Sequence, residues 1–91
     1  MAGPVVVNLP TKKTFVKVAT NVITGTIYQQ GSGVYWQTWV DTGDPAPVFA
    51  TLETANALVT MSRAEPISAV TGIDIYIAAS VDDANVRVDA S

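Results

Sequence analysis

The stretch from Gly25 to Gly43 constrains the fold more than any other part of the chain, because it holds both tryptophans and two of the three tyrosines. Residues 26–29 and 34–40 have the composition of two β-strands, and the Gly31-Ser32-Gly33 link can supply the positive φ angles of a short hairpin loop. The sequence therefore predicts a β-hairpin. Alternation in its second strand puts a large aromatic on each face, so we expect that strand to be buried on both sides or to lie at a subunit contact.

Short alternating apolar runs continue along the chain. They cover residues 5–9, 14–19, 22–29, 73–79 and 86–89. The clearest is 73–79, in which Ile73, Ile75 and Ile77 share one face. Burying each isoleucine contributes about 1.5–3 kcal/mol, so this strand is the expected anchor of the core. We expect the final run to pair back as the last strand, and Gly25 to mark a β-bulge or a close backbone approach.

The region after the predicted hairpin is the least regular part of the pattern. Residues 41–47 contain turn formers and two prolines. Residues 48–61 combine helical spacing with several threonines, and we expect a strand or loop there, with room for a helical turn. About seven short strands, with a turn about every 8–12 residues, predict an all-β fold. We expect a single small antiparallel β-sandwich or jelly-roll-like barrel spanning residues 1–91, with residues 1–10 as a candidate N-terminal arm.

Composition excludes several classes of chemistry. Cysteine and histidine are both absent, which removes disulfides, thiolate chemistry, the usual zinc sites and histidine acid–base catalysis. A chain of this length buries only about 60–65% of its unfolded surface, so it gains from additional support. With 48% hydrophobic and only 14% charged residues, that support is expected from oligomerisation or docking on a larger assembly. We predict a homo-oligomer without cofactor or metal.

Charge is distributed unevenly. Residues 1–40 contain three lysines and no acid, whereas residues 41–91 contain all eight acids. We expect the two halves to neutralise each other, in preference to a dipolar subunit whose basic edge meets a neighbour's acidic edge. The net charge of −3 argues against nucleic-acid binding. No apolar run is long enough to cross a membrane, and the first residues lack the pattern of a signal peptide.

Asp41-Thr42-Gly43 matches the signature of aspartic proteases, in which two such loops share one proton across a two-fold axis. Asp41 would then be catalytic. Only Gly43 and Gly72 occur after residue 40, however, so a glycine-rich flap is missing, and Pro45 disrupts the following turn. A strand-ending turn is the preferred interpretation, with no catalytic residues in the chain.

Two other groups of residues have a functional and a structural interpretation. The acids Asp82, Asp83 and Asp89, with Asn85, lack the ligand spacing of an EF-hand, so a solvated turn is preferred over a calcium loop. The aromatics Tyr35, Trp36 and Trp39 form either a sugar- or partner-binding platform or part of a β-sandwich core. Tyr35 and Trp39 share the strand face that ends in Asp41, and are the preferred contact residues.

The segment from Ala2 to Pro10 is apolar, short and bounded by prolines, so it is a candidate for strand addition to a neighbouring subunit. Val5, Val7 and Leu9 share one face of the expected strand and are the residues predicted to make that contact. The predicted partner-binding residues are therefore Val5, Val7, Leu9, Tyr35 and Trp39.

Three pieces of the chain carry a resemblance when they are taken in order. They are Val-Asn-Leu-Pro at 7–10 with Phe-Val-Lys-Val at 15–18, the run at 34–43, and Gly-Ile-Asp-Ile-Tyr-Ile-Ala at 72–78 followed by Val-Arg-Val-Asp at 86–89. Together they resemble a group of small β-sandwich virion proteins of tailed bacteriophages. The resemblance implies a non-enzymatic capsid decoration (cement) subunit bound to the major capsid protein, or else a head-fibre, neck, connector or tail subunit, assembled in the host cytoplasm. The alternatives from other classes are the aspartic-protease dimer and a carbohydrate-binding module that uses Trp36 or Trp39.

Overall fold

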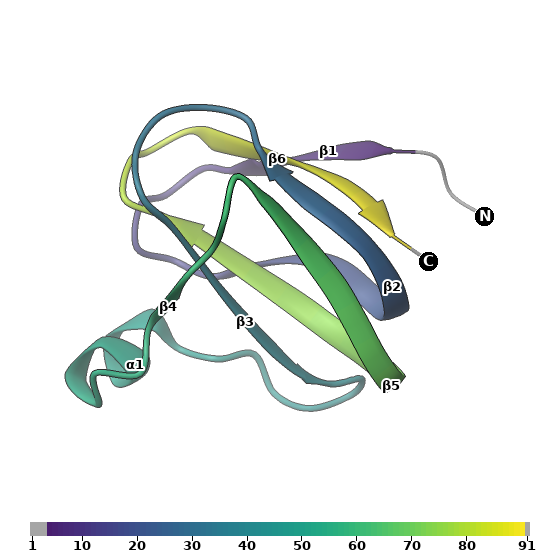
Figure 1. The fold of residues 1–91 in the computed structure, drawn as a ribbon. Helices are drawn as coiled ribbons and strands as arrows, with labels where there is room; N and C mark the ends of the chain where they lie inside the picture. The colour runs from purple at the N-terminus through teal and green to yellow at the C-terminus, as the bar shows by residue number, and fades with distance from the viewer. Residues whose placement is uncertain (1–3, 91) are drawn as a thin grey trace.

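The computed structural model describes residues 4–90, which form one antiparallel sheet of six strands and a short helix (Figure 1). In chain order the elements are β1 (Val5–Leu9), β2 (Val16–Gln29), β3 (Tyr35–Asp41), α1 (Phe49–Thr54), β4 (Val59–Thr60), β5 (Ala64–Ala79) and β6 (Ala84–Ala90). Neighbours in the sheet follow the order β1-β6-β2-β5-β3-β4. The predicted all-β class is confirmed.

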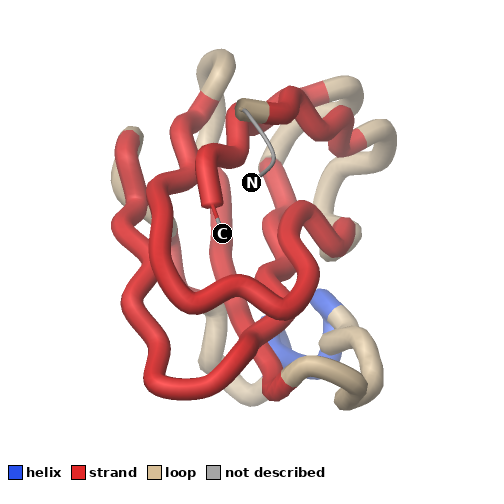
Figure 2. Tube along the Cα trace, turned by 90° about the vertical axis from the view of Figure 1, so that its right-hand side faces the viewer, coloured by secondary structure: helices blue, strands red, loops and turns tan. Residues whose placement is uncertain are grey.

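The long strands β2 and β5 pair with each other and bend together, and this bend shapes the molecule. Val22 is paired with Ile73 but Thr24 with Ser68, so β5 carries extra residues at the bend, as in a β-bulge. Asn21 adopts a φ of +52 there, a conformation that asparagine tolerates better than most residues. The bend rolls the sheet into two layers (Figures 1 and 2). One layer combines β1 and β6 with the second half of β2 and the first half of β5; the other contains the remaining halves with β3 and β4.

The core lies between these two layers. Its buried members come from all strands except β4, together with Met61. Ile75 and Ile77 are buried, and Ile73 packs against the cluster, so the prediction that this strand anchors the core is confirmed. Gly25 is also placed as predicted, because the backbone of β6 at Asp89 and Ala90 passes directly against its Cα.

The predicted hairpin between residues 26–29 and 34–40 is wrong. These segments belong to β2 and β3, but β5 lies between them in the sheet. The link folds away from a hairpin because Val34 bonds to Ser80 in both directions: its N–H donates to the Ser80 hydroxyl, and its carbonyl accepts the Ser80 N–H. This starts the β3–β5 ladder, which continues from Tyr35 opposite Ala79.

The final strand also differs from a simple return hairpin. β6 does not pair with β5 but with β1 and β2. The reason is that residues 73–77 of β5 already have β2 on one edge and β3 on the other, so neither edge is open to a third strand. The turn at residues 80–83 therefore carries the chain into the other layer.

Residues 48–61, expected as strand or loop with room for a helical turn, form α1 and the short β4. Phe49 fixes the helix, since its buried ring contacts Phe15 and Trp36 at centroid distances of 5.5 and 5.0 Å. Helical spacing prevails because only this residue of the helix needs full burial, while its threonines face solvent. No helix within residues 4–90 is long and apolar enough to span a membrane.

Candidate interaction surface

A groove that is open to solvent lies between β3 and the first half of β5. We call it the Trp39 groove. It forms because β3 bonds only to β4 and to the second half of β5, so the first half of β5 has β2 as its only partner among the described strands. The groove has a volume of about 340 Å³. Its lining residues are Ile27, Gln37, Trp39, Glu65, Pro66, Ile67, Ser68, Ala69, Val70, Thr71, Ile73 and Ile75.

The groove has an apolar floor and an exposed apolar rim. Four isoleucines from both layers belong to the apolar lining. Two further large apolar side chains are open to solvent: Trp39 is 55% and Val70 is 97% exposed. Covering the exposed half of a tryptophan removes roughly 130 Å² from water, worth about 3 kcal/mol before the costs of association. Exposed apolar surface beside a groove is a feature that protein-, membrane- and ligand-binding sites share.

Val70 is exposed because of the bend. It belongs to the residues of β5 that lie between the Ser68 and Ile73 register positions and have no paired residue on β2. Sequence reasoning missed Val70. The signal that could have found it is the loss of alternation in Ser-Ala-Val-Thr-Gly immediately before the isoleucine-rich strand.

The predicted partner-binding residues are not brought together. Leu9 and Tyr35 lie in the core at 0% and 1% exposure, and the Tyr35 hydroxyl donates a 3.3 Å hydrogen bond to the carbonyl of Asn85. Val7 is half-buried against the same cluster. Val5 and Trp39 do offer surface, but on different layers. Val5 lines a separate aliphatic groove of about 210 Å³ beside β2 and β6.

The three clustered aromatics take three different environments, so they form no shared platform. Tyr35 is a core residue. Trp36 is half-buried and meets the Phe49 ring edge to face, which places it beneath α1. Only Trp39 is open to a ligand. Alternation separates Trp36 from the other two aromatics, which share the opposite face of β3. Tyr35 and Trp39 differ because only Tyr35 lies deep between the layers.

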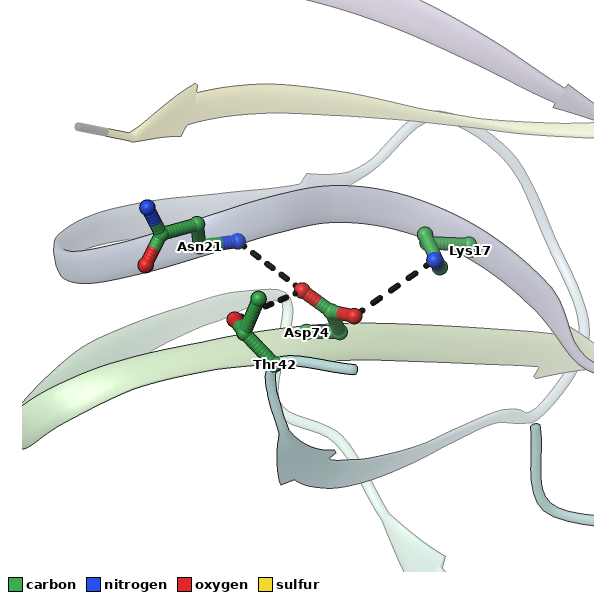
Figure 3. Close-up of polar contacts among 4 residues, drawn as sticks. All are labelled: Lys17, Asn21, Thr42 and Asp74. Atoms are coloured by element: carbon green, nitrogen blue, oxygen red, sulfur yellow. Dashed lines mark hydrogen bonds and ion pairs between the residues drawn. The ribbon is translucent and has the colours of Figure 1, made fainter. Parts of the chain in front are cut away.

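One buried carboxylate holds the bend (Figure 3). Asp74, whose side chain is 2% exposed, accepts hydrogen bonds at Oδ1 from the Asn21 N–H and the Thr42 hydroxyl, both at 2.9 Å. Its Oδ2 lies 3.4 Å from Lys17 Nζ. The Asn21 N–H does most to hold the pKa of Asp74 below its ordinary value; burial opposes this, while Thr42, Lys17 and the Gly43 N–H reinforce it. The carboxylate thereby ties the bend of β2 at Asn21 and the turn after β3 to β5.

The Asp-Thr-Gly motif is accounted for by this arrangement. Asp41 is an exposed residue at the end of β3, and its carbonyl accepts the Asp44 N–H at 3.0 Å to close a turn. The Thr42 N–H donates to the carbonyl of Gly72, while its hydroxyl serves Asp74. In this chain the motif forms a strand-ending turn that is fixed to β5.

The acidic turn also has structural bonds. Asp82 Oδ1 accepts the Lys12 N–H at 2.8 Å, and Asp83 Oδ1 accepts Asn8 Nδ2 at 2.9 Å. These bonds tie β1 and the following loop to the β5–β6 turn. Among residues 4–90, no group of three or more acidic, histidine or cysteine residues could hold a metal ion. Lys17 and Asp74 form an ion pair between the two halves of the chain.

Comparisons with protein-family models, with curated proteins and with solved structures give no match for this chain. The fold and the Trp39 groove define it as a small all-β domain with an exposed apolar groove.

Proposed function

We propose that the protein is a non-enzymatic structural subunit of a bacteriophage virion, a decoration protein that binds the major capsid protein between capsomers. The observation that carries the proposal is the Trp39 groove, where an exposed tryptophan and valine stand over an isoleucine-rich floor. A chain with few charges and this much exposed apolar surface gains stability from a partner. The strand patterns that resemble small virion proteins supply the identity of that partner.

The groove suits a loop or extended segment with an apolar side chain. Ile67 and Ile73 face it from the two layers, so an inserted side chain would meet aliphatic surface on both sides. Gln37 and Glu65 add polar groups to the lining and can receive backbone N–H groups of the inserted segment. Trp39 provides the large rigid contact that is typical of binding hot spots.

The mechanism is thermodynamic. Each copy that contacts two neighbouring capsomers adds buried interface that must be lost when they separate. A modest contribution per copy becomes large when it is repeated across a shell, because many sites must open together. No chemical step is required of the subunit.

Co-sedimentation with empty capsids of the phage that encodes the protein tests the proposal. Trp39→Ala and Val70→Ala should each weaken binding, with Trp39→Ala reducing affinity about 30-fold, as loss of a hot-spot residue worth about 2 kcal/mol does. Val48→Ala is the matched control, because Val48 is exposed but lies outside the groove. If wild-type protein does not bind capsids but sediments with necks or tails, the subunit belongs to those structures instead of the capsid. Failure to bind any virion part would overturn the proposal.

A further inference from the structure

The rolled sheet leaves four strand edges without a partner within residues 4–90. They are the outer edges of β1 and β4, the first half of β5, and the first half of β2. An unpaired edge presents a row of N–H and C=O groups that another strand can bond, and natural proteins blunt such edges with charges, prolines, bulges or short length. The four edges can therefore be compared for how well each is protected.

Three of the edges are blunted. β4 has only two residues. The first half of β2 has repeated register shifts and the charged Lys17. On β5, the Gln29 N–H donates to the carbonyl of Arg63, and backbone direction alternates along a strand, so residue 66 points toward the free edge. That residue is Pro66, which has no N–H to offer a neighbouring strand.

The edge of β1 has none of these protections. Its five residues pair with β6 in an unbroken register from Val5 opposite Val88 to Leu9 opposite Ala84. The strand contains no charge, no proline and no bulge. Val5 and Val6 are 50% and 60% exposed, so apolar side chains accompany the open backbone groups. A polypeptide strand is the ligand that such an edge fits, since only a strand supplies the complementary ladder.

We propose that β1 pairs antiparallel with β1 of a second copy of this chain across a two-fold axis. An uncharged strand is self-complementary in this arrangement, because no like charges face each other across the axis. Side chains on the same face must lie opposite one another, and the register that places Val7 opposite Val7 of the second copy uses all five residues. Val6 of each copy then lies opposite Asn8 of the other.

The other edges explain why the partner is a single second copy and why assembly stops there. Pairing β1 with β4, β5 or β2 of another copy would meet the blunted edges described above. Head-to-tail growth is thereby disfavoured, and the two-fold contact closes on itself. The Trp39 groove adjoins the free edge of β5, at the opposite end of the layer from β1, and stays open in such a dimer. The pairing therefore does not rest on capsid binding.

The test measures the molar mass of the purified full chain by light scattering over a concentration series. Wild-type protein should approach twice 9.6 kDa. Val6→Lys should remain monomeric or dimerise at least ten-fold more weakly, because it adds one charge to each copy beside the axis. Val48→Lys is the matched control, since Val48 has the same 60% exposure but lies on the loop before α1. Circular dichroism checks that both variants are folded.

Hydrogen exchange of wild-type protein gives a second readout that needs no variant. Alternate amides of β1 should gain protection as the dimer forms, while amides of β4 should not. A wild-type chain that stays monomeric at all concentrations would overturn the proposal. So would a dimer that survives Val6→Lys, or one whose β1 amides gain no protection. If Val6→Lys does not fold, the hydrogen-exchange pattern of wild-type protein tests the β1 pairing by itself. Capsid binding is measured in a separate experiment and does not bear on this test.

Discussion

Gly25 offers the sharpest test of how the two layers are joined. Its φ is +148, and a Cβ built on it would lie 2.5 Å from the Cα of Ala90 and closer still to the carbonyl oxygen of Asp89. Both of these atoms belong to the backbone of β6, so no side-chain rotation can relieve the contact. Gly25→Ala should therefore force β6 away from β2.

The cost can be worked out from these contacts. Relief of the clash requires a shift of roughly 1 Å, which breaks one or two ladder hydrogen bonds worth about 0.5–1.5 kcal/mol each. The unfavourable backbone conformation adds about 1–3 kcal/mol. The total, about 4 kcal/mol, is a large fraction of the roughly 5–14 kcal/mol expected for a domain of this size. The midpoint of thermal unfolding should fall by about 15–30 °C.

Two glycines provide controls that separate the contributions. At Gly31 an added Cβ meets only the Tyr35 hydroxyl, at 3.4 Å, so Gly31→Ala should change stability by less than about 0.5 kcal/mol. Gly43 has a φ of +98 but nothing within 4 Å, so Gly43→Ala should show the backbone cost alone, about 1–3 kcal/mol. Unfolding in guanidinium, followed by tryptophan fluorescence, measures all three. If Gly25→Ala costs no more than Gly43→Ala, the close approach of β6 to β2 is refuted.

Three further predictions follow from single side chains. The pKa of Asp74 is held below its ordinary value of 3.8 in the folded state, so the stability that its carboxylate contributes is present above about pH 4 and is lost as the pH falls through the lowered pKa. Asp74→Asn should therefore flatten the acid limb of a profile of stability against pH, and an unchanged limb would contradict this role of Asp74. Leu9→Ala should lower the free energy of unfolding by about 2–5 kcal/mol because Leu9 is a core residue, whereas Val6→Ala should change it by less than about 0.5 kcal/mol under monomeric conditions. Equal losses in urea unfolding would place Leu9 outside the core. Tyr35→Phe should lose the bond to the Asn85 carbonyl and about 0.5–1.5 kcal/mol in the same assay, and a neutral effect would indicate that the bond does not form.

Local pattern predicted those parts of the fold in which neighbouring residues decide the outcome. The alternating isoleucines specified a buried strand, and Gly25 specified a close backbone approach, because side-chain period and the missing Cβ act directly at those positions. The prediction of a hairpin was wrong because the neighbouring residues do not decide the outcome there. A glycine-rich link permits a hairpin but does not require one, and Val34 instead forms hydrogen bonds with Ser80, which is distant in the sequence. Pairing partners in a sheet depend on contacts that a local pattern does not contain.

The candidate surface was predictable only in part. Trp39 was selected for its strand face, and it is the exposed tryptophan. Tyr35 shares that face but lies deeper, because burial along a strand depends on where the opposite layer ends. Leu9 was expected at a partner contact and instead fills the core beneath β1. Val70 became prominent through the bulge of β5, which follows from a register shift between two strands that only the folded chain reveals.

The proposal that the protein stabilises a shell by binding through the Trp39 groove is tested most directly by the temperature at which capsids open. Capsids of the phage to which the proposal assigns the protein are heated with wild-type protein, with Trp39→Ala or with no addition, and opening is followed by dye access to the packaged DNA. Wild-type protein should raise the opening temperature, and Trp39→Ala should raise it much less. An opening temperature that is the same with and without bound wild-type protein would contradict the proposed function.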